Sequence, residues 1–405
     1  MISIFIIAFI SNSWTKNGGD WLNLKTVQDA YQQHYEELAS IPVETAIREP
    51  SVLTEIIEQA SDNPHSQYKL IFVSDHGAEA IRTLNDLPPN VEIIWSGHQL
   101  VAGWEQLPVH KWYLPEHSLP ISDSHHQRNM VPLPGVITPG HKLSDSATNQ
   151  ERMTSPCAKE VIWMLSGDAR KDHAGDSTLI DSWLLLKPDY SDKVVQILSK
   201  NPIFNDVQKV SIVNSPRTGA WEILTSSAVF SVMRLEKTDY HSKPLDLKSN
   251  IDPITQSAQK AISTHLPKAT IDIGHYWREA PSQKDGSVIH HSNYQTKIDA
   301  FLQNPEALLL IPGDSVTDVS KIISTQHCID HRDKVFVILT DTMTPSIASW
   351  VENLYSQGYF GTIDVRSSQR EPLLLPVHDA SPEPKNILSE VRQCLDNAAT
   401  ASNRP

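Results

Sequence analysis

Apolar runs and polar turns alternate along the chain in a pattern that predicts strands followed by helices. Residues 308–311, Leu-Leu-Leu-Ile, are an apolar run of the kind that forms a strand buried on both faces of a parallel sheet. A Pro-Gly pair then turns the chain. Ser315 is placed to cap a helix over 316–323, with Asp318 as its capping-box partner.

This strand, turn and capped helix would place free backbone N–H groups and the positive helix end at the carboxyl edge of a sheet. Such an edge is well suited to binding phosphate. The same pattern also fits an ordinary turn between a strand and a helix, which recurs throughout α/β proteins. The pattern alone therefore leaves both interpretations open.

The first part of the chain repeats the strand-and-helix pattern. Predicted strands cover residues 1–10, 41–46, 68–73, 91–95, 109–114 and 130–136, with helices near 27–35, 51–59 and 78–84. Polar residues follow several of these strands, namely Asp75, His76, His98, Glu116 and His117. Ligands of parallel sheets lie beyond the carboxyl ends of the strands, so these residues are candidates for a site. With 18 histidines in the chain, a single one is more often a surface or capping residue.

The second part repeats the pattern after residues 140–158, a polar stretch without apolar period that we interpret as a linker. Predicted strands cover residues 161–165, 207–213, 228–235, 269–275, 308–311 and 335–339. Predicted helices lie near residues 191–199, 221–226, 256–264, 296–303, 316–323, 345–355 and 387–395. Alternating strands and helices favour doubly wound parallel sheets with right-handed crossovers.

The predicted fold class is α/β, with two tandem Rossmann-like doubly wound domains that face a central cleft, as in GT-B proteins. We expect a first domain over residues 1–145 and a second over 158–380. Residues 381–405 should form a helix that crosses back to the first domain, followed by a frayed tail. A chain of 405 residues suits two domains of ordinary size.

Composition narrows the functional classes. Hydrophobic residues make up 39% of the chain and charged residues 20%, so it can bury a sizeable core. The formal net charge of -14 argues against nucleic acid or an anionic membrane surface as the main partner. The 3 cysteines, Cys157, Cys328 and Cys394, have no metal-ligand or disulfide spacing and suit a reducing compartment.

The apolar N-terminus, residues 1–10, is about half as long as the ~20 residues that span a bilayer. It also lacks the positive segment and cleavage site of a signal peptide. We interpret it as the first, central strand. The expectation is a cytoplasmic protein with no integral membrane segment.

Five short segments carry a family resemblance. Residues 314–320, Asp-Ser-Val-Thr-Asp-Val-Ser, resemble the D-S-V-S-M-V-S-E signature of the mitochondrial-fission family founded by the plant elongated-mitochondria protein. Residues 114–117 are similar to its V-P-E-H-D segment, and residues 129–138 to its N-V-x-x-T-x-G segment. Residues 165–168 resemble its I-G-G strand end, and residues 214–218 its T-S-R-R-T-P segment. All five occur in the family's order.

The chain also departs from the family pattern. Residues 11–20 do not contain the family's D-G-R-P-G-H-x-x-Q loop, and Lys321 stands where an acidic residue is usual. Residues 332–335, Arg-Asp-Lys-Val, match the family's G-K-P-V only loosely. Because that acidic residue commonly holds a nucleotide ribose in related glycosyltransferases, the recognition of ribose is in question.

The resemblance implies a metal-independent GT-B glycosyltransferase that transfers a sugar from a nucleotide-sugar donor to an unknown acceptor. The donor would be a substrate, and no cofactor or metal is implied. The second domain would hold its diphosphate with the residues of two segments, Gly313, Asp314, Ser315, Val316 and Thr317, and Gly167, Asp168, Ser215, Arg217 and Thr218. Arg217 would clamp the leaving diphosphate. In the first domain, His76, or Glu116 with His117, would supply a general base for the acceptor.

Two other functional classes fit the same resemblance. The plant member acts as an adaptor that recruits a dynamin-like protein, so a non-catalytic interaction protein on a degenerate GT-B fold is the main alternative, and it would have a protein partner. Asp318 and Lys321 favour this class, because they stand in place of the family's usual polar and acidic residues. Asp318 would also repel phosphate if its side chain pointed toward the phosphate-binding turn. An epimerase or hydrolase of sugar nucleotides is the third class.

Overall fold

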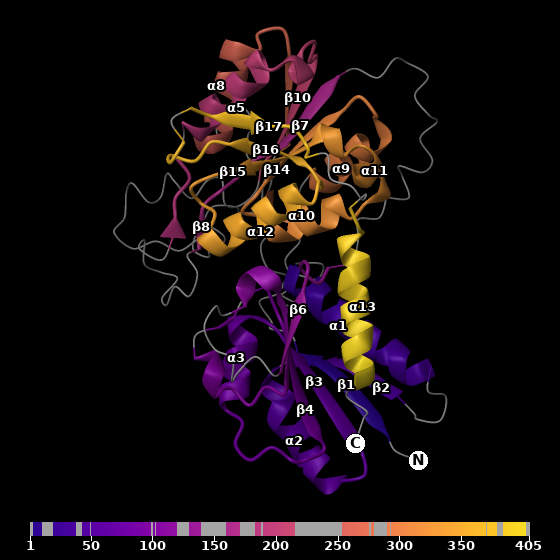
Figure 1. The fold of residues 1–405 in the computed structure, drawn as a ribbon. Helices are drawn as coiled ribbons and strands as arrows, with labels where there is room; N and C mark the ends of the chain where they lie inside the picture. Colours follow the sequence, from indigo (N-terminus) through magenta and orange to yellow (C-terminus); the bar gives the residue numbers. More distant parts are fainter. Residues whose placement is uncertain are drawn as a thin grey trace. The chain divides into compact units, whose positions relative to one another are not determined.

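The computed structural model describes residues 3–9, 19–37, 43–48, 50–98, 100–101, 103–119, 129–138, 159–170, 183–187, 189–214, 253–274, 277–278, 290–291, 293–369, 371–378 and 384–401. The chain divides into two compact units (Figure 1). One contains Met1–Gly140 and Lys385–Pro405, and the other contains His141–Ala280 and Ile289–Pro384. The predicted α/β class is confirmed, because each unit is built on a largely or wholly parallel sheet.

The first unit contains a six-stranded parallel sheet in the order β2-β1-β3-β4-β5-β6. The strands are β1 (Ile4–Phe9), β2 (Val43–Arg48), β3 (Gln67–Phe72), β4 (Val91–Ser96), β5 (Lys111–Pro115) and β6 (Met130–Leu133). Its helices are α1 (Gly19–Glu37), α2 (Leu53–Asp62), α3 (Ser74–Arg82) and α13 (Ile387–Ala401). The apolar N-terminal run is therefore an inner strand of this sheet.

The two faces of the first sheet differ in polarity. On one face, Ile56 of α2 and Ile81 of α3 pack against strand residues such as Phe72 and Trp95 in a hydrophobic core. Strand side chains alternate between faces, so the residues between them point to the other face. That face lies under α1, and it carries the register partners Lys69 and Glu92.

The polar face under α1 contains a buried ion pair. Lys69 Nζ donates to Glu92 Oε2, and their side chains are 6% and 22% exposed. Burial lowers the pKa of Lys69, but the charge of Glu92, the nearby Tyr35 and the hydrogen bonds to both together outweigh it, and the pKa is raised. The Lys69 ammonium also lies 5.9 Å from the ring centroid of Tyr31 and 5.6 Å from that of Tyr35, both on α1.

The last helix belongs to the first unit. α13 lies beside α1 and contacts β6, although 287 residues separate Lys111 of β5 from Ala398 of α13 (Figure 1). Lys111 Nζ donates to the Ala398 carbonyl oxygen at 2.7 Å, close to the carboxyl end of the helix, where a cation is favourable. Glu92 Oε1 lies 3.9 Å from the same ammonium group. The buried ion pair and the docking of α13 thus share one carboxylate.

The second unit contains a seven-stranded sheet in the order β11-β10-β7-β14-β15-β16-β17. The strands are β7 (Glu160–Met164), β10 (Lys209–Val213), β11 (Thr270–Gly274), β14 (Leu308–Pro312), β15 (Val335–Leu339), β16 (Gly361–Asp364) and β17 (Leu373–Leu375). All are parallel except β17, which pairs antiparallel with β16. Two further pairs of two-residue strands are β8 (Ala169–Arg170) with β9 (Trp183–Leu184), and β12 (Trp277–Arg278) with β13 (His290–His291).

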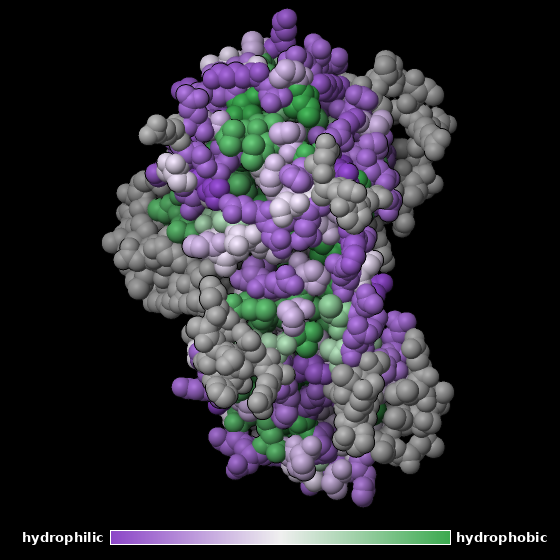
Figure 2. All heavy atoms as spheres, viewed as in Figure 1, coloured by the Kyte–Doolittle hydropathy of each residue, from purple (hydrophilic) through white to green (hydrophobic). Residues whose placement is uncertain are grey.

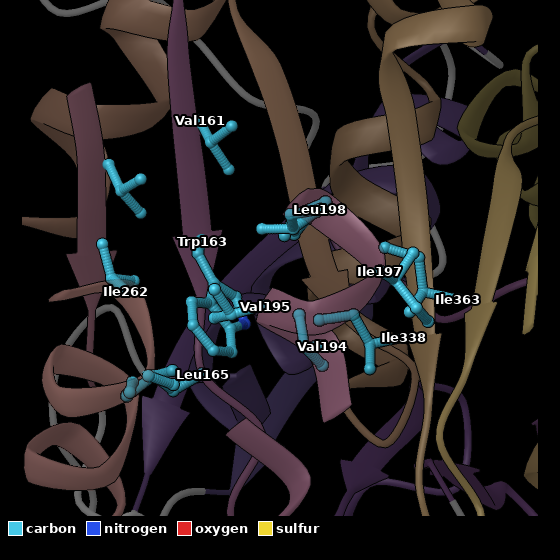
Figure 3. Packing of buried hydrophobic residues seen from close by; sticks show 14 of the residues in the cluster. Val161, Trp163, Leu165, Val194, Val195, Ile197, Leu198, Ile262, Ile338 and Ile363 are labelled. Atoms are coloured by element: carbon cyan, nitrogen blue, oxygen red, sulfur yellow. The ribbon is translucent and has the colours of Figure 1, made fainter. Parts of the chain in front are cut away.

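Helices on both faces cover this sheet. They are α5 (Tyr190–Lys200), α8 (Pro253–His265), α9 (Tyr294–Gln303), α10 (Val316–Ile323), α11 (Gln326–Asp330) and α12 (Pro345–Ser356). On one face, Val194 and Ile197 of α5 lie against Ile338 and Ile363 of the sheet, with Trp163 beside them (Figure 3). Burying a side chain of this size is worth about 1.5–3 kcal/mol, so this core is a main source of the unit's stability.

The surface in Figure 2 is mostly hydrophilic, with smaller hydrophobic patches. Within the described residues, the exposed large hydrophobic side chains are Leu373 and Leu375 of β17, at 43% and 37%. No helix in the described ranges is long and apolar enough to cross a membrane.

The structure adds elements that the hydrophobic pattern did not predict. β16, Gly-Thr-Ile-Asp, and the short edge strand β17 were not expected, whereas the uncertain strand at 269–275 is present as β11. The strand expected at 228–235 and the helix expected at 221–226 lie outside the described residues.

The buried ion pair makes a prediction about stability. Glu92→Gln should lower the free energy of unfolding of the first unit by about 3–5 kcal/mol, because it leaves the Lys69 ammonium buried without its counter-charge. Replacing both partners, as Lys69→Met with Glu92→Leu, should recover most of that loss. Urea denaturation followed by circular dichroism measures both.

The matched control is Asp29→Asn on the surface of α1. Lys25 Nζ lies 2.7 Å from Asp29 Oδ1, but the two side chains are 41% and 57% exposed, so the change should cost less than about 1 kcal/mol. Equal losses for Glu92→Gln and Asp29→Asn would show that the Lys69–Glu92 pair is not effectively buried.

Candidate functional site

The strand order of the second sheet marks a candidate site. From β7 the chain builds the sheet in one direction through β10 and β11, and then returns to the other side of β7 with β14, β15 and β16. Numbered within the unit this is the order 3-2-1-4-5-6 of dinucleotide-binding folds, whose ligands bind where the order reverses, at the carboxyl ends of the strands. Here that point lies between β7 and β14, which pair through Leu308 with Val161 and Leu310 with Trp163.

The residues after β7 are buried and form hydrogen bonds with the segment that contains Leu186 and Tyr190. The Ser166 N–H donates to the Tyr190 hydroxyl oxygen at 3.2 Å, and Asp168 Oδ1 accepts from the Leu186 N–H at 2.8 Å. Gly167 between them is also buried. Asp168 is only 1% exposed, so it positions the segment around Leu186. Ser166 is fully buried and lies beside the Tyr190 hydroxyl.

The turn after β14 requires a glycine. The Gly313 N–H donates to the Ile338 carbonyl oxygen at 2.9 Å. A Cβ at position 313 would lie 2.8 Å from Met343 Sδ and 2.9 Å from the same carbonyl oxygen. Gly313 is thus needed for the close approach of this turn to β15 and the loop that follows it.

Asp314 comes next and is 8% exposed. Burial raises the pKa of the Tyr190 hydroxyl well above its usual range, and the negative charge of Asp314 adds to the effect. The residues after β7 and after β14 therefore lie close enough to influence one another electrostatically.

The start of α10 differs from the sequence prediction. Ser315 precedes the helix, but its hydroxyl makes no capping bond to the backbone and donates to Asp318 Oδ2 at 2.5 Å. The expected capping box is therefore wrong. A carboxylate is the stronger acceptor for a hydroxyl, and the resulting bond joins the two side chains directly. Val316 and Thr317 begin the helix, so their N–H groups lie in its first turn, where N–H groups have no partner within the helix.

The Asp318 carboxylate also interacts with a residue of α9. Burial raises the pKa of the Tyr294 hydroxyl, and the nearby charge of Asp318 and a hydrogen bond to it add to the rise. The Lys321 ammonium lies 5.7 Å from the Tyr294 ring centroid. Asp318 is thus held between Ser315 and Tyr294 at the amino end of α10.

Three buried threonines follow β15, and sequence reasoning missed them. Thr340, Thr342 and Thr344 are 1%, 0% and 2% exposed. The Thr340 and Thr342 hydroxyl oxygens are 2.7 Å apart, and Thr344 Oγ1 accepts from the Ile347 N–H at 3.4 Å to cap α12. The available signal was Thr-Asp-Thr-Met-Thr directly after an unbroken apolar strand. These hydroxyls add polar groups at the same edge of the sheet.

Charged residues at the end of β16 were also not predicted. Arg366 donates to both oxygens of the buried Asp364, and its Nη2 lies 2.6 Å from Asp364 Oδ2. Its Nη1 lies 3.2 Å from Glu352 Oε1. Arg366 is therefore committed to carboxylates within the chain. Lys187 is exposed, and its Nζ lies 3.5 Å from Ser367 Oγ. Lys187 thus places a positive charge near the carboxyl edge of the sheet.

Three predicted residues of the second unit, Ser215, Arg217 and Thr218, lie outside the described residues. Their positions stay predictions. The preceding residue, Asn214, follows β10, and its N–H donates to the Gly274 carbonyl oxygen at 3.3 Å.

The predicted base candidates of the first unit lie at or near the carboxyl ends of β3 and β5. His76 lies in the first turn of α3, but its side chain is outside the described residues. Glu116 is exposed, and its charge contributes to raising the pKa of Cys394 on α13, after burial and Glu390. Burial and the nearby His98 lower the pKa of His117 to about 4. His117 is therefore neutral at pH 7 and a weak base, since general bases work best with a pKa near the operating pH.

The structure provides no cluster of three or more His, Cys, Asp or Glu placed to hold a metal ion within its described residues.

The lowered pKa of His117 predicts a pH effect on stability. The folded-state pKa of about 4 lies below the ordinary value of about 6.5, so the unfolded state binds the proton first as the pH falls. The stabilisation is therefore complete above pH 6.5 and is lost between about pH 6.5 and pH 4. His117→Gln should remove roughly 1–3 kcal/mol of the difference in unfolding free energy between pH 7 and pH 4.5, measured by urea denaturation.

His65→Gln is the control, because His65 is exposed on the surface and the substitution should leave the difference between the two pH values unchanged. The burial of His117 would be contradicted if its substitution left the pH dependence of stability at the wild-type value.

The close approach at Gly313 predicts an overpacking effect. Gly313→Ala should lower the free energy of unfolding of the second unit by about 1–3 kcal/mol, because the added carbon meets Met343 Sδ and the Ile338 carbonyl oxygen. Adding Met343→Ala should restore only part of the loss, since the carbonyl oxygen cannot move away without disturbing β15. Full recovery in the double variant, measured by denaturant unfolding, would assign the whole clash to Met343.

Comparison with known proteins gives only distant similarities. No protein-family model and no curated protein matches the chain. Among solved structures, it is similar to MurG of Acinetobacter baumannii, with 10% identity, a TM-score of 0.35 and coverage of 99% of this chain and 98% of that chain. It is also similar to an ABC-transporter solute-binding protein of Conexibacter woesei, with 11% identity, a TM-score of 0.25 and coverage of 100% and 98%. Similarity at this level supports no functional inference.

Proposed function

We propose that this protein is a GT-B-type, glycosyltransferase-like protein that binds a nucleotide sugar at the carboxyl edge of its second sheet. The observation that carries the proposal is the 3-2-1-4-5-6 strand order, with polar residues gathered where the order reverses. Strand ends at such a point supply backbone N–H groups and hydroxyls to a nucleotide. The resemblance of residues 314–320 to the fission-family signature points to the same edge.

In this proposal the diphosphate of the donor lies at the amino end of α10. The first-turn N–H groups of Val316 and Thr317 and the helix dipole would bind its oxygens. Ser166 and Gly167 after β7 would contact the rest of the nucleotide. Arg217 would neutralise charge on the leaving diphosphate.

The proposed reaction is transfer of the sugar to a hydroxyl of an unknown acceptor. The acceptor oxygen forms a bond to the anomeric carbon while the bond from that carbon to the diphosphate oxygen breaks, and the diphosphate leaves with the bonding electrons. The acceptor proton passes to a general base. His76 or Glu116 is a better candidate than His117, whose pKa of about 4 makes it a weak base at neutral pH.

A second function has its own supporting observation. The amino end of α10 carries the carboxylates of Asp314 and Asp318, and the Ser315 hydroxyl is already bonded to Asp318. These carboxylates already interact with the positive end of the helix dipole, and their negative charge would repel a phosphate bound there. This favours a non-catalytic adaptor on a degenerate GT-B fold, with a protein partner in place of a donor.

The magnitude of this effect does not exclude the donor. A charge at a helix end is worth about 0.3–1 kcal/mol at an exposed site. That corresponds to a change in Kd of roughly 2- to 5-fold, because 1.4 kcal/mol is a factor of ten. The carboxylates alone would therefore weaken diphosphate binding without abolishing it, and the nucleotide-binding function remains our proposal.

Isothermal titration with UDP, GDP and their sugars tests the proposal. Wild type should bind at least one of these nucleotides. Asp318→Asn should tighten binding by roughly 2- to 5-fold, because it removes a negative charge beside the diphosphate and weakens the hydrogen bond that the Ser315 hydroxyl donates to residue 318. Arg217→Ala should weaken binding of the same nucleotide.

The control is Glu55→Gln, which removes a first-turn carboxylate from α2 of the first unit and should leave the affinity unchanged. Absence of binding to every nucleotide and nucleotide sugar would favour the adaptor function. Binding that is unaffected by Asp318→Asn would place the diphosphate away from α10.

A further inference from the structure

Two histidines of the second unit lie far from the proposed nucleotide site in the topology of the sheet. His327 lies in α11, and His331 follows the last residue of that helix. The chain then passes through residues 332–334 into the first residue of β15. The pair is therefore at the amino edge of the sheet, whereas the proposed nucleotide site is at the carboxyl edge. Nothing in the proposed function uses this pair.

Backbone geometry places the two side chains on one face of a helical turn. The His331 N–H donates to the His327 carbonyl oxygen at 2.9 Å, which is the i to i+4 bond of an α-helix. Residues four apart lie one above the other on the helix surface. The two imidazole ring centroids are 4.6 Å apart, with an angle of 50° between the ring planes.

This separation fits two rings that bind one ion. A metal lies about 2.0–2.1 Å from a coordinating imidazole nitrogen, and so roughly 3.2 Å from the ring centroid. Two rings at an angle of about 90–110° at the metal would then have centroids roughly 4.5–5.2 Å apart. The observed 4.6 Å lies within that range.

The two rings lie in partly buried surroundings. Both histidines are half-buried, and the Phe301 ring of α9 packs against His327 with centroids 5.1 Å apart. Burial lowers the pKa of His327, and the neighbouring His331 lowers it further; Asp330 acts in the opposite direction and Lys334 in the same direction. A neutral imidazole is the form that binds a metal, because the ion needs the nitrogen lone pair.

We propose that His327 and His331 form a two-imidazole binding site for a divalent transition-metal ion such as Ni²⁺, Cu²⁺ or Zn²⁺. Imidazole nitrogen suits these ions, whereas Mg²⁺ and Ca²⁺ prefer oxygen. No third His, Cys, Asp or Glu in the described part of the chain completes the set, so water fills the remaining positions. The site is therefore expected to bind with modest affinity and to exchange its ion.

Titration calorimetry with NiCl₂ in a buffer that does not bind metals, at pH 7.5, tests the site. Wild type should bind one more equivalent of Ni²⁺ than the double variant His327→Gln with His331→Gln. Either single substitution should lower the affinity for that Ni²⁺ ion by roughly 100-fold, because one imidazole then binds the ion in place of two. The chain has 18 histidines, including the adjacent pairs His125-His126 and His290-His291, and some of these can also bind Ni²⁺. The readout is therefore the difference in bound Ni²⁺ between wild type and the variants.

His65→Gln is the matched control, because His65 is an exposed histidine of the other unit and its loss should leave the titration as in wild type. Identical titrations for wild type and the double variant would overturn the proposal. Circular dichroism of the metal-free variants establishes that they remain folded.

A second measurement needs no substitution. Modification of wild type with diethylpyrocarbonate, followed by peptide mass spectrometry, should show His327 and His331 protected by Ni²⁺ while His65 is modified equally with and without the ion. Modification of the two histidines at the same rate in both conditions would also overturn the proposal. These outcomes are independent of nucleotide binding.

Discussion

The pairing of β14 with β7 is the contact on which the second unit and its candidate site depend. It joins the strands built before α9 to those built after it, through Leu308 with Val161 and Leu310 with Trp163. These same residues form part of the hydrophobic core under α5 and α8, so the backbone pairing and the burial of side chains stabilise one arrangement. Because both strands are parallel, the residues after them, Ser166 and Gly313, end at the same edge, which is where a ligand can be bound.

Buried polar groups have different consequences in the two units. In the first unit, Glu92 holds Lys69 under α1 and lies near Lys111, which donates to the carboxyl end of α13. These groups satisfy one another inside the unit. In the second unit polar residues also lie at the strand ends, and the N–H groups in the first turn of α10 have no partner within the helix. This edge is the basis of the proposed nucleotide site in the second unit, where Asp318 would weaken phosphate binding without abolishing it.

Much of the fold could be predicted from periodicity. The apolar run at 308–311 is β14, and the N-terminal run is β1, because strands buried on both faces need nearly continuous apolar residues. β16 was missed because Gly-Thr-Ile-Asp has no such run, although it is buried in the sheet. At the site, the turn at Gly313 and the start of α10 were predicted in the correct place. The capping box was wrong, because the Asp318 carboxylate accepts from the Ser315 hydroxyl and no side-chain bond caps the helix, and spacing alone cannot distinguish these two arrangements.

The sequence by itself therefore determined what depends on neighbours along the chain: the strands, the helices, the turn at Gly313 and the spacing of His327 and His331. Only the tertiary structure decided the order of the strands, and with it the point where the second sheet reverses. It also decided that Lys69 pairs with Glu92, that Lys111 reaches the last helix 287 residues away, and that burial keeps His117 neutral. The physical reason is that pairing, burial and pKa depend on groups brought together from distant positions, whereas hydrophobic periodicity reports only which face of each element is buried.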